Sequence, residues 1–357
     1  MLTYLLQRIF YSLLTLFGVV TLIFFLFNAG MGDPTQMKLG QRSNKEAALR
    51  IQRDLGLDKP LGVRYAAYLN DLLPLSLHSK NEESVFYYSR QKYGGVSLSV
   101  GSAVAALKFP YLRRSYQSEK KVSQLISSVF PNTLALAMAA ITFASIAGIF
   151  LGMLAAVFSN TLVDRSILTI ATLGMSTPSF FAALLMGWIF AFLLGSYTGL
   201  NLTGNLWELD DYGNGLQLQL RNLILPAITL GIRPLSVITQ LTRGSLLDVL
   251  SQDYVRTARA KGLSFMQALR KHALRNALNP VVTAISGWFA SMLAGVIFVE
   301  YIFGYKGLGF LMVDGLNNLD MPVVMGCVML IAVAFVVVNL LADMLYALLD
   351  PRVKFKA

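Results

Sequence analysis

Long apolar runs separated by short polar stretches dominate the chain. A helix needs roughly 20 mostly apolar residues to cross the hydrocarbon core of a bilayer. Six segments have this character, and we expect a membrane-spanning helix at each: 9–28, 131–158, 166–195, 223–247, 280–299 and 323–349. The pattern therefore predicts an all-α integral membrane protein with six transmembrane helices.

Three of these segments need interpretation. The apolar run of 9–28 is longer than the ~7–15 residues of a signal-peptide core, so we interpret it as an uncleaved anchor. Pro178 interrupts 166–195, which is too short for two crossings, and we expect one kinked helix there. Arg233 places a charge inside 223–247, and a charge at membrane depth is a functional candidate by default. Its alternative is structural pairing with a carbonyl, with Asp343 or with a partner chain.

Composition supports a membrane protein. Of the 357 residues, 55% are hydrophobic and 14% charged, where soluble domains have about 25% charged residues. The mean hydropathy of +0.58 also excludes a disordered chain. One cysteine and two histidines exclude an internal disulfide framework and make a Cys- or His-based metal site improbable, so no metal is expected.

Basic residues orient the predicted helices. Six spans place both termini on one side, and the short loops of that side hold twelve Lys and Arg. The short loops of the other side hold two, Arg221 and Lys306. Because Lys and Arg accumulate in cytoplasmic loops, both termini are predicted to be cytoplasmic.

The 29–130 segment is predicted to be an extracytoplasmic mixed insert between the first two spans. A capping box at Ser43–Glu46 indicates a helix over about 44–55, and Pro60 begins a second helix ending near Leu73. Residues 76–114 follow an irregular pattern, and a short helix over 119–128 leads into the second span. The predicted organisation is thus an anchor (1–28), a lid segment (29–130) and a core with five transmembrane helices (131–357).

The predicted cytoplasmic loop 248–279 has the most specific local signals. Ser251 can cap a helix, Gly262 suits a left-handed stop, and Ser264 with Gln267 forms a second capping box. The loop therefore predicts a helix, a glycine corner and a second helix, and we call residues 251–265 the elbow. A short basic elbow suits docking onto another protein, but it also suits a helix lying on anionic lipid.

The residues of this loop resemble a known family. DYVRTARAKGL at 253–263 and HALRNALNPVV at 272–282 are similar to the EAA-motif loop of ABC-importer permeases, in the dipeptide/oligopeptide/nickel branch. Arg256-Thr257-Ala258 stand in place of Glu-Ala-Ala. Further similar stretches extend over nearly the whole chain: the amino terminus with Gly32-Asp33-Pro34, LGLDKPLGVRY at 55–65, Leu225-Pro226-Ala227, Glu300–Gly309 and NLLADMLYALLDPR at 339–352.

The resemblance implies one transmembrane half of an ATP-driven importer in the bacterial cytoplasmic membrane. It implies a homologous second permease, two ATPase subunits that bind ATP and Mg, and an extracytoplasmic substrate-binding protein. It makes the elbow a coupling helix that docks on the ATPase. The residues expected to make that contact are Tyr254, Arg256, Thr257, Ala258, Arg259, Lys261, Gly262 and Leu263.

The chain is not expected to be the ATPase, because it has no G-x-x-x-x-G-K-[ST] phosphate loop, and ATP hydrolysis is expected in a separate chain. A membrane-embedded enzyme would need clustered Asp, His or Cys near one face of the bilayer, and the sequence offers no such cluster. Arg233 and Glu300 are candidates for the transport pathway or a gate, although Glu300 could instead anchor the turn at 303–309. The alternative function is an ATP-independent secondary transporter or channel. Few intramembrane acids and no clear internal repeat argue against it. The cargo itself is not defined by these residues.

Overall fold

The computed structural model describes residues 2–29, 58–82, 84–209 and 215–349. The helix predicted at 44–55 lies outside these residues. The chain divides into two compact units, which we describe separately. The larger unit comprises Met1–Leu13, Val129–Phe310 and Ile331–Ala357, and the smaller unit comprises Leu14–Ser128 and Leu311–Leu330.

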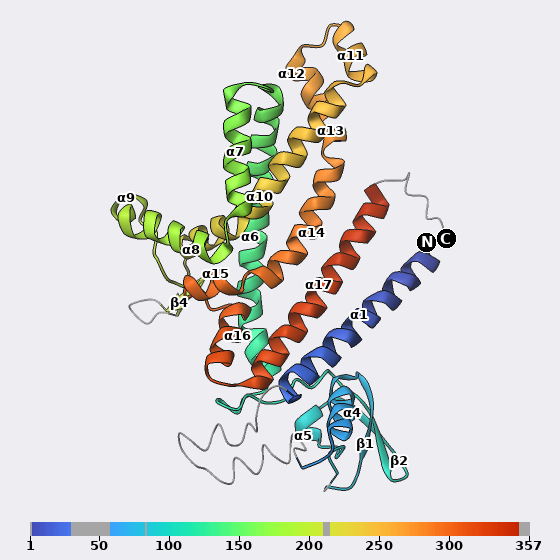
Figure 1. The fold of residues 1–357 in the computed structure, drawn as a ribbon. Helices are drawn as coiled ribbons and strands as arrows, with labels where there is room; N and C mark the ends of the chain where they lie inside the picture. The colour runs from blue at the N-terminus through green and yellow to red at the C-terminus, as the bar shows by residue number, and fades with distance from the viewer. Residues whose placement is uncertain (1, 30–57, 83, 210–214, 350–357) are drawn as a thin grey trace. The chain divides into compact units, whose positions relative to one another are not determined.

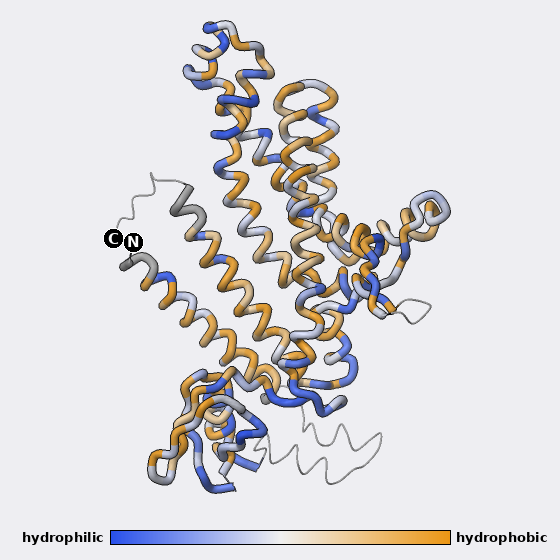
Figure 2. The backbone as a smooth tube through the Cα atoms, turned by 180° about the vertical axis from the view of Figure 1, so that it is seen from behind, coloured by the Kyte–Doolittle hydropathy of each residue, from blue (hydrophilic) through white to orange (hydrophobic). Residues whose placement is uncertain are grey.

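Apolar helices account for most of the described chain, as the predominantly orange helices of Figure 2 show. Four are long and apolar enough to cross a membrane: α1 (Leu2–Ala29), α6 (Val122–Val157), α10 (Arg221–Leu250) and α17 (Met321–Leu349). Two bent pairs bring the number to as many as six within the described residues. The predicted helical membrane class is confirmed, and the exact six-span topology stays a prediction.

The first bent pair corrects the prediction for 166–195. Instead of one kinked helix, α7 (Leu162–Ser176) ends before Pro178, and α8 (Ser179–Met186) begins after it and continues as the π-helix η1 (Gly187–Leu193). The two arms are bent by 111°. The ring of Pro178 disfavours helical backbone at Thr177, which has a ψ of 127°. The proline therefore ends the helix rather than kinking it.

The second bent pair leads from the elbow into an apolar helix. It consists of α12 (Phe265–Ala268), η2 (Leu269–Ala273) and α13 (Leu274–Ala277), followed by α14 (Asn279–Gly295) at 49°. The shorter helices α15 (Ile297–Ile302) and α16 (Leu308–Asn317) follow α14. A small α9 (Gly195–Thr198) and the hairpin of β4 (Trp207–Leu209) with β5 (Leu216–Leu218) precede α10.

The core of the larger unit is built from α6, α8, α10, α14 and α15. Buried residues from these helices pack into one apolar cluster that includes Leu136, Leu225, Met292 and Phe303. The cluster positions α10, the helix that leads into the elbow (Figure 1).

The smaller unit contains a sheet that the sequence pattern did not predict. After α4 (Leu61–Leu72), the strands β1 (Leu75–Ser79), β2 (Val96–Val100) and β3 (Ala103–Leu107) pair antiparallel in the order β1-β3-β2, with the short α5 (Arg90–Tyr93) between β1 and β2. The sequence pattern of 76–114 is irregular, but the three strands lie within residues 75–107. In β1 the usual alternation is inverted: polar Ser76 and His78 are buried, whereas Leu75 and Leu77 are exposed.

The helix predicted at 119–128 also differs from the structure. Backbone in helical form begins at Val122 and continues as α6 through the second predicted span, with Pro131 inside it. The predicted second helix from Pro60 is confirmed as α4, with Pro60 at its N-cap.

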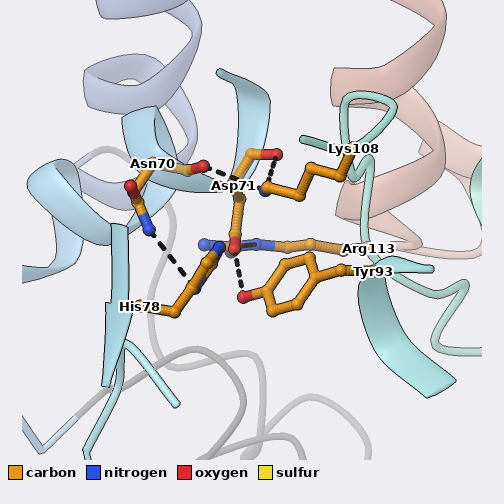
Figure 3. Close-up of polar contacts among 6 residues, drawn as sticks. All are labelled: Asn70, Asp71, His78, Tyr93, Lys108 and Arg113. Carbon is orange, nitrogen blue, oxygen red and sulfur yellow. Dashed lines mark hydrogen bonds and ion pairs between the residues drawn. The ribbon is translucent and has the colours of Figure 1, made fainter. Parts of the chain in front are cut away.

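A buried polar cluster explains the inverted sheet (Figure 3). Tyr93 donates its hydroxyl to Asp71 Oδ1 at 2.7 Å, and Arg113 Nε lies 3.9 Å from Asp71 Oδ2. Lys108 Nζ donates to the carbonyls of Asn70 at 3.0 Å and Asp71 at 2.7 Å, near the end of α4. Burial lowers the pKa of Lys108 to about 8, and the neighbouring Asp71 opposes this shift. On β1, the Ser76 hydroxyl lies 2.9 Å from His78 Nε2, and Asn70 Nδ2 lies 3.4 Å from His78 Nδ1, so the buried polar side chains of this strand have partners.

We expect the Asp71→Asn variant to destabilise the smaller unit by about 3 kcal/mol, because Arg113 and Lys108 lose their buried counter-charge. The measurement is limited proteolysis of the purified protein, followed at sites within 58–128. Asp58→Asn is the matched control, because Asp58 is exposed and forms an ion pair with exposed Lys59. Equal cleavage rates for the two variants would contradict a structural role for Asp71.

Candidate functional site

The elbow lies beyond the end of α10, at the top of Figure 1. It consists of α11 (Asp253–Ala260), the corner Lys261-Gly262-Leu263 and the start of α12. The helix–corner–helix form predicted from the sequence is confirmed.

Gly262 closes the first helix of the elbow. Its φ of +95° lies in a region that side-chain-bearing residues rarely adopt. The Gly262 N–H donates to the Arg259 carbonyl at 3.0 Å, and the Leu263 N–H donates to the Ala258 carbonyl at 3.3 Å. These two bonds form a Schellman motif, which satisfies carbonyls at the end of α11. The predicted left-handed stop is therefore present at Gly262.

The two predicted caps have different outcomes. The Ser264–Gln267 capping box is present, with bonds of 3.3 Å and 3.1 Å. The predicted Ser251 cap is wrong, because the N-cap of α11 is Gln252. Ser251 keeps helical backbone as the C-cap of α10, and its hydroxyl donates to the Asp248 carbonyl at 2.7 Å.

One side of α11 is anchored to the rest of the larger unit. Val255 and Ala258 are buried, at 1% and 8% exposure, three residues apart on the same helical face. Val255 belongs to a cluster whose buried members are Ala156, Leu246, Val255, Ala268, Leu269, Ala273 and Ala277. Ala258 therefore faces its own chain, and α11 has an apolar base formed by α6, α10 and the helices after the corner.

The opposite side of α11 is exposed and basic. Six of the eight predicted contact residues are exposed: Tyr254, Arg256, Thr257, Arg259, Lys261 and Gly262. Leu263 is half-buried. Polar blue segments mark the elbow in Figure 2. Most of the predicted residues are thus exposed on the elbow.

Internal contacts hold several of these exposed side chains in place. The Arg259 guanidinium lies 5.7 Å from the centre of the Phe265 ring, and Asn276 donates to the Tyr254 hydroxyl at 2.9 Å. Arg256 lies 3.7 Å from Asp253, but both side chains are largely exposed, so this ion pair contributes little. The surface therefore presents net positive charge to a partner.

Glu300 is fully buried within the larger unit. Its carboxylate accepts hydrogen bonds from the Thr133 hydroxyl at 2.7 Å and from the N–H groups of Gly309 at 2.7 Å and Phe310 at 3.2 Å. Gly307 and Gly309 leave no room for a Cβ beside it. This geometry gives Glu300 the turn-anchoring contacts that were one alternative from the sequence.

Arg233 has a different environment. Its side chain is exposed on the surface of α10, and no ion pair among the described residues involves it. Asp343, one partner considered for it, instead lies 3.1 Å from Arg8.

Thr133 and the pair Asp164–Arg243 are residues that sequence reasoning missed. Thr133 donates to Glu300 and accepts the Leu308 N–H at 2.7 Å. Asp164, in the first turn of α7, binds Arg243 of α10 through two hydrogen bonds of 2.6 Å. In the sequence, each of these residues is a polar residue inside or beside an apolar run. This pattern indicates that the side chain has a polar partner but does not identify the partner. No cluster of three or more His, Cys, Asp or Glu able to hold a metal occurs among the described residues.

Comparisons with known proteins cover the whole chain. The family model "Binding-protein-dependent transport system inner membrane component" matches residues 148–355, and the model for the N-terminal part of such membrane components matches residues 1–84. A di/tripeptide transport system permease from Pseudomonas aeruginosa, DppB, is 34% identical, with 99% of each chain covered. The glutathione transport system permease GsiC from Salmonella paratyphi A is 33% identical over the full length of both chains.

A solved structure shares the fold. The inward-facing methionine ABC transporter MetNI contains a chain that matches with a TM-score of 0.51 at 18% identity, covering 64% of this chain and 97% of that one. The elbow lies within the region that the main family model matches. This chain therefore belongs to the inner membrane components of binding-protein-dependent transport systems, as a multi-pass permease of the peptide ABC-importer type.

Proposed function

We propose that this permease forms half of the transmembrane pathway of an ATP-driven importer for peptides or related small solutes. The observation that carries the proposal is the elbow: a capped, basic helix anchored on one side and exposed on the other. Relatives that match over their full length are named as di/tripeptide and glutathione permeases, which supports this substrate class.

The elbow is suited to transmit force from an ATPase. Val255 joins α11 to the apolar cluster formed with α6, α10 and the helices after the corner, so a displacement of the exposed surface carries the cluster with it. The Schellman motif and the capping box satisfy backbone groups on both sides of Gly262, and these bonds resist bending at the corner. The exposed cations can meet acidic residues of a docking groove.

The remaining parts of the proposal concern assembly. The elbow and both termini face the cytoplasm of a bacterial cell, and two ATPase subunits bind ATP and Mg there. A second, homologous permease completes the pathway, and an extracytoplasmic binding protein delivers the cargo. Arg233 is a candidate for the pathway or for contact with the second permease, because it is exposed on α10. Glu300 acts on a gate only through the turn that it anchors.

The test is native purification of the tagged protein in mild detergent, with its companions identified by mass spectrometry. We expect a second permease and ATPase subunits in stoichiometric amounts. The double variant Arg256→Glu with Lys261→Glu should reduce ATPase recovery at least tenfold, because it reverses the charge of the docking surface. Lys306→Glu is the charge-reversal control, since Lys306 is exposed but remote in sequence from the elbow.

Two outcomes would contradict the proposal. A stable wild-type protein without any ATPase would favour the secondary transporter or channel. Normal ATPase recovery with the double variant would remove the elbow cations from the docking contact.

A further inference from the structure

An ion pair between buried Asp164 and half-buried Arg243 joins α7 to the end of α10 that carries the elbow. Asp164 is 2% exposed, and both of its carboxylate oxygens are bound by Arg243, Oδ1 by Nε and Oδ2 by Nη2, each at 2.6 Å. The N–H of Asn160 also donates to Oδ2 at 2.9 Å. Such a bidentate pair fixes both the separation and the orientation of the two side chains.

The same end of α10 is packed against the elbow. Leu246, one helical turn after Arg243, is fully buried in the cluster that contains Val255 of α11. Ala156, near the end of α6, belongs to the same cluster. The ion pair therefore lies on the α10 segment whose next turn touches the elbow.

Glycines bring α6 and α7 close to α10 along the preceding turns. A Cβ on Gly148 would lie 3.0 Å from the Leu235 carbonyl oxygen, and one on Gly152 would lie 2.6 Å from the Thr239 carbonyl oxygen. On α7, a Cβ on Gly174 would lie 2.9 Å from the Ser236 hydroxyl. These contacts position the helices closely, but apolar surfaces and small residues alone allow sliding. The bidentate pair adds a fixed register between α7 and α10.

We propose that Asp164 and Arg243 are positioning residues that lock α7 to the elbow-bearing end of α10, so that a displacement of the elbow moves α7. The inference rests on the proposed function, because it requires an ATPase that displaces the elbow. It adds the route by which this displacement enters the transmembrane helices: from α11 through Leu246 to Arg243, and from Asp164 into α7. After Ser176 the helix axis bends by 111° between α7 and the helix that follows it, so α7 moves as a separate short helix.

A purely structural role for the pair makes a different prediction. Replacing one partner of a buried ion pair destabilises a protein because the other charge is left uncompensated. That effect would lower the yield of the assembled complex. It would leave the conformational response of each assembled complex unchanged. The response must therefore be measured relative to the amount of assembled complex.

The experiment follows α7 directly and needs no knowledge of the cargo. A cysteine is introduced by Met175→Cys near the end of α7, where the native side chain is exposed, and buried Cys327 is replaced by alanine. The purified complex with its ATPase is labelled with N-ethylmaleimide before and after trapping with ATP and vanadate. We expect trapping to change the labelling rate at least fivefold in the otherwise native protein, and this change to disappear in Asp164→Asn.

Arg243→Lys and Asp343→Asn sharpen the test. Arg243→Lys retains the charge but not the bidentate geometry, so it should also lose the response, and it replaces Asp164→Asn if that variant does not assemble. Asp343→Asn removes the carboxylate of a half-exposed ion pair with Arg8, and its response should be that of the native protein.

Two results would overturn the inference. The first is an unchanged labelling response in assembled Asp164→Asn or Arg243→Lys complexes, however low their yield. The second is a native complex that traps vanadate without any change at position 175. Absence of an ATPase from the native preparation would instead overturn the proposed function, and it is detected before any labelling.

Discussion

The Glu300→Ala variant is expected to lose roughly 3–5 kcal/mol of folding free energy, because three hydrogen-bond donors would be left buried without their acceptor. Thr133 and the N–H groups of Gly309 and Phe310 all converge on this carboxylate. The measurement is thermal stability of the detergent-solubilised protein, followed by size-exclusion chromatography.

Two further variants identify the source of this loss. Thr133→Val removes one donor and the acceptor of the Leu308 N–H, and we expect about half of the destabilisation. Glu208→Ala is the matched control, because its carboxylate is half-buried and accepts a hydrogen bond from the Asn205 N–H. A melting temperature for Glu300→Ala equal to that of the control would show that the carboxylate does not anchor the turn.

Val255→Asp should abolish ATP-dependent transport while leaving the rest of the permease folded. An unpaired carboxylate in the apolar base of the elbow costs about 3–5 kcal/mol, and separation of α11 from its base relieves that cost. The residues that form the base are distributed over α6, α10, α12 and η2. We therefore expect α11 to separate from the base while those helices remain packed against one another. Recovery of the ATPase after native purification and protease sensitivity at residues 251–265 are the two measurements.

Gln252→Asp controls for the added charge. Gln252 is exposed at the N-cap of α11, where an acidic side chain is favourable. This variant changes net charge by the same amount as Val255→Asp but leaves the apolar base intact. Equal loss of the ATPase in both variants would show that negative charge near the elbow, rather than the buried anchor, is responsible.

The sequence by itself determined the membrane class and the local form of the elbow. Long uncharged runs specify apolar helices because the hydrophobic signal is present in each segment separately. The glycine corner and the Ser264–Gln267 box were predictable because their partners lie within five residues of each other. The basic face of α11 followed from the composition of one short helix.

Local signals failed where a neighbouring element competes for the same residue. Ser251 is a good N-cap by type, but α10 continues through Leu250 and keeps Ser251 helical. Pro178 could have kinked a continuous helix, and only the structure shows that the helix ends. In β1, the buried Ser76 and His78 reverse the usual alternation because the interior of the smaller unit is polar around Asp71.

Only the tertiary structure decided which distant polar groups meet. Asp164 and Arg243 are 79 residues apart, and Thr133 and Glu300 are 167 apart. Each residue by itself indicates that a buried polar group needs a partner, but no periodicity or spacing in the chain identifies that partner. The helix packing around α10 brings the first pair together, and the return of the chain after α15 brings Gly309 and Phe310 to Glu300. These contacts depend on the folded arrangement of several helices, which is the physical reason that the sequence alone could not specify them.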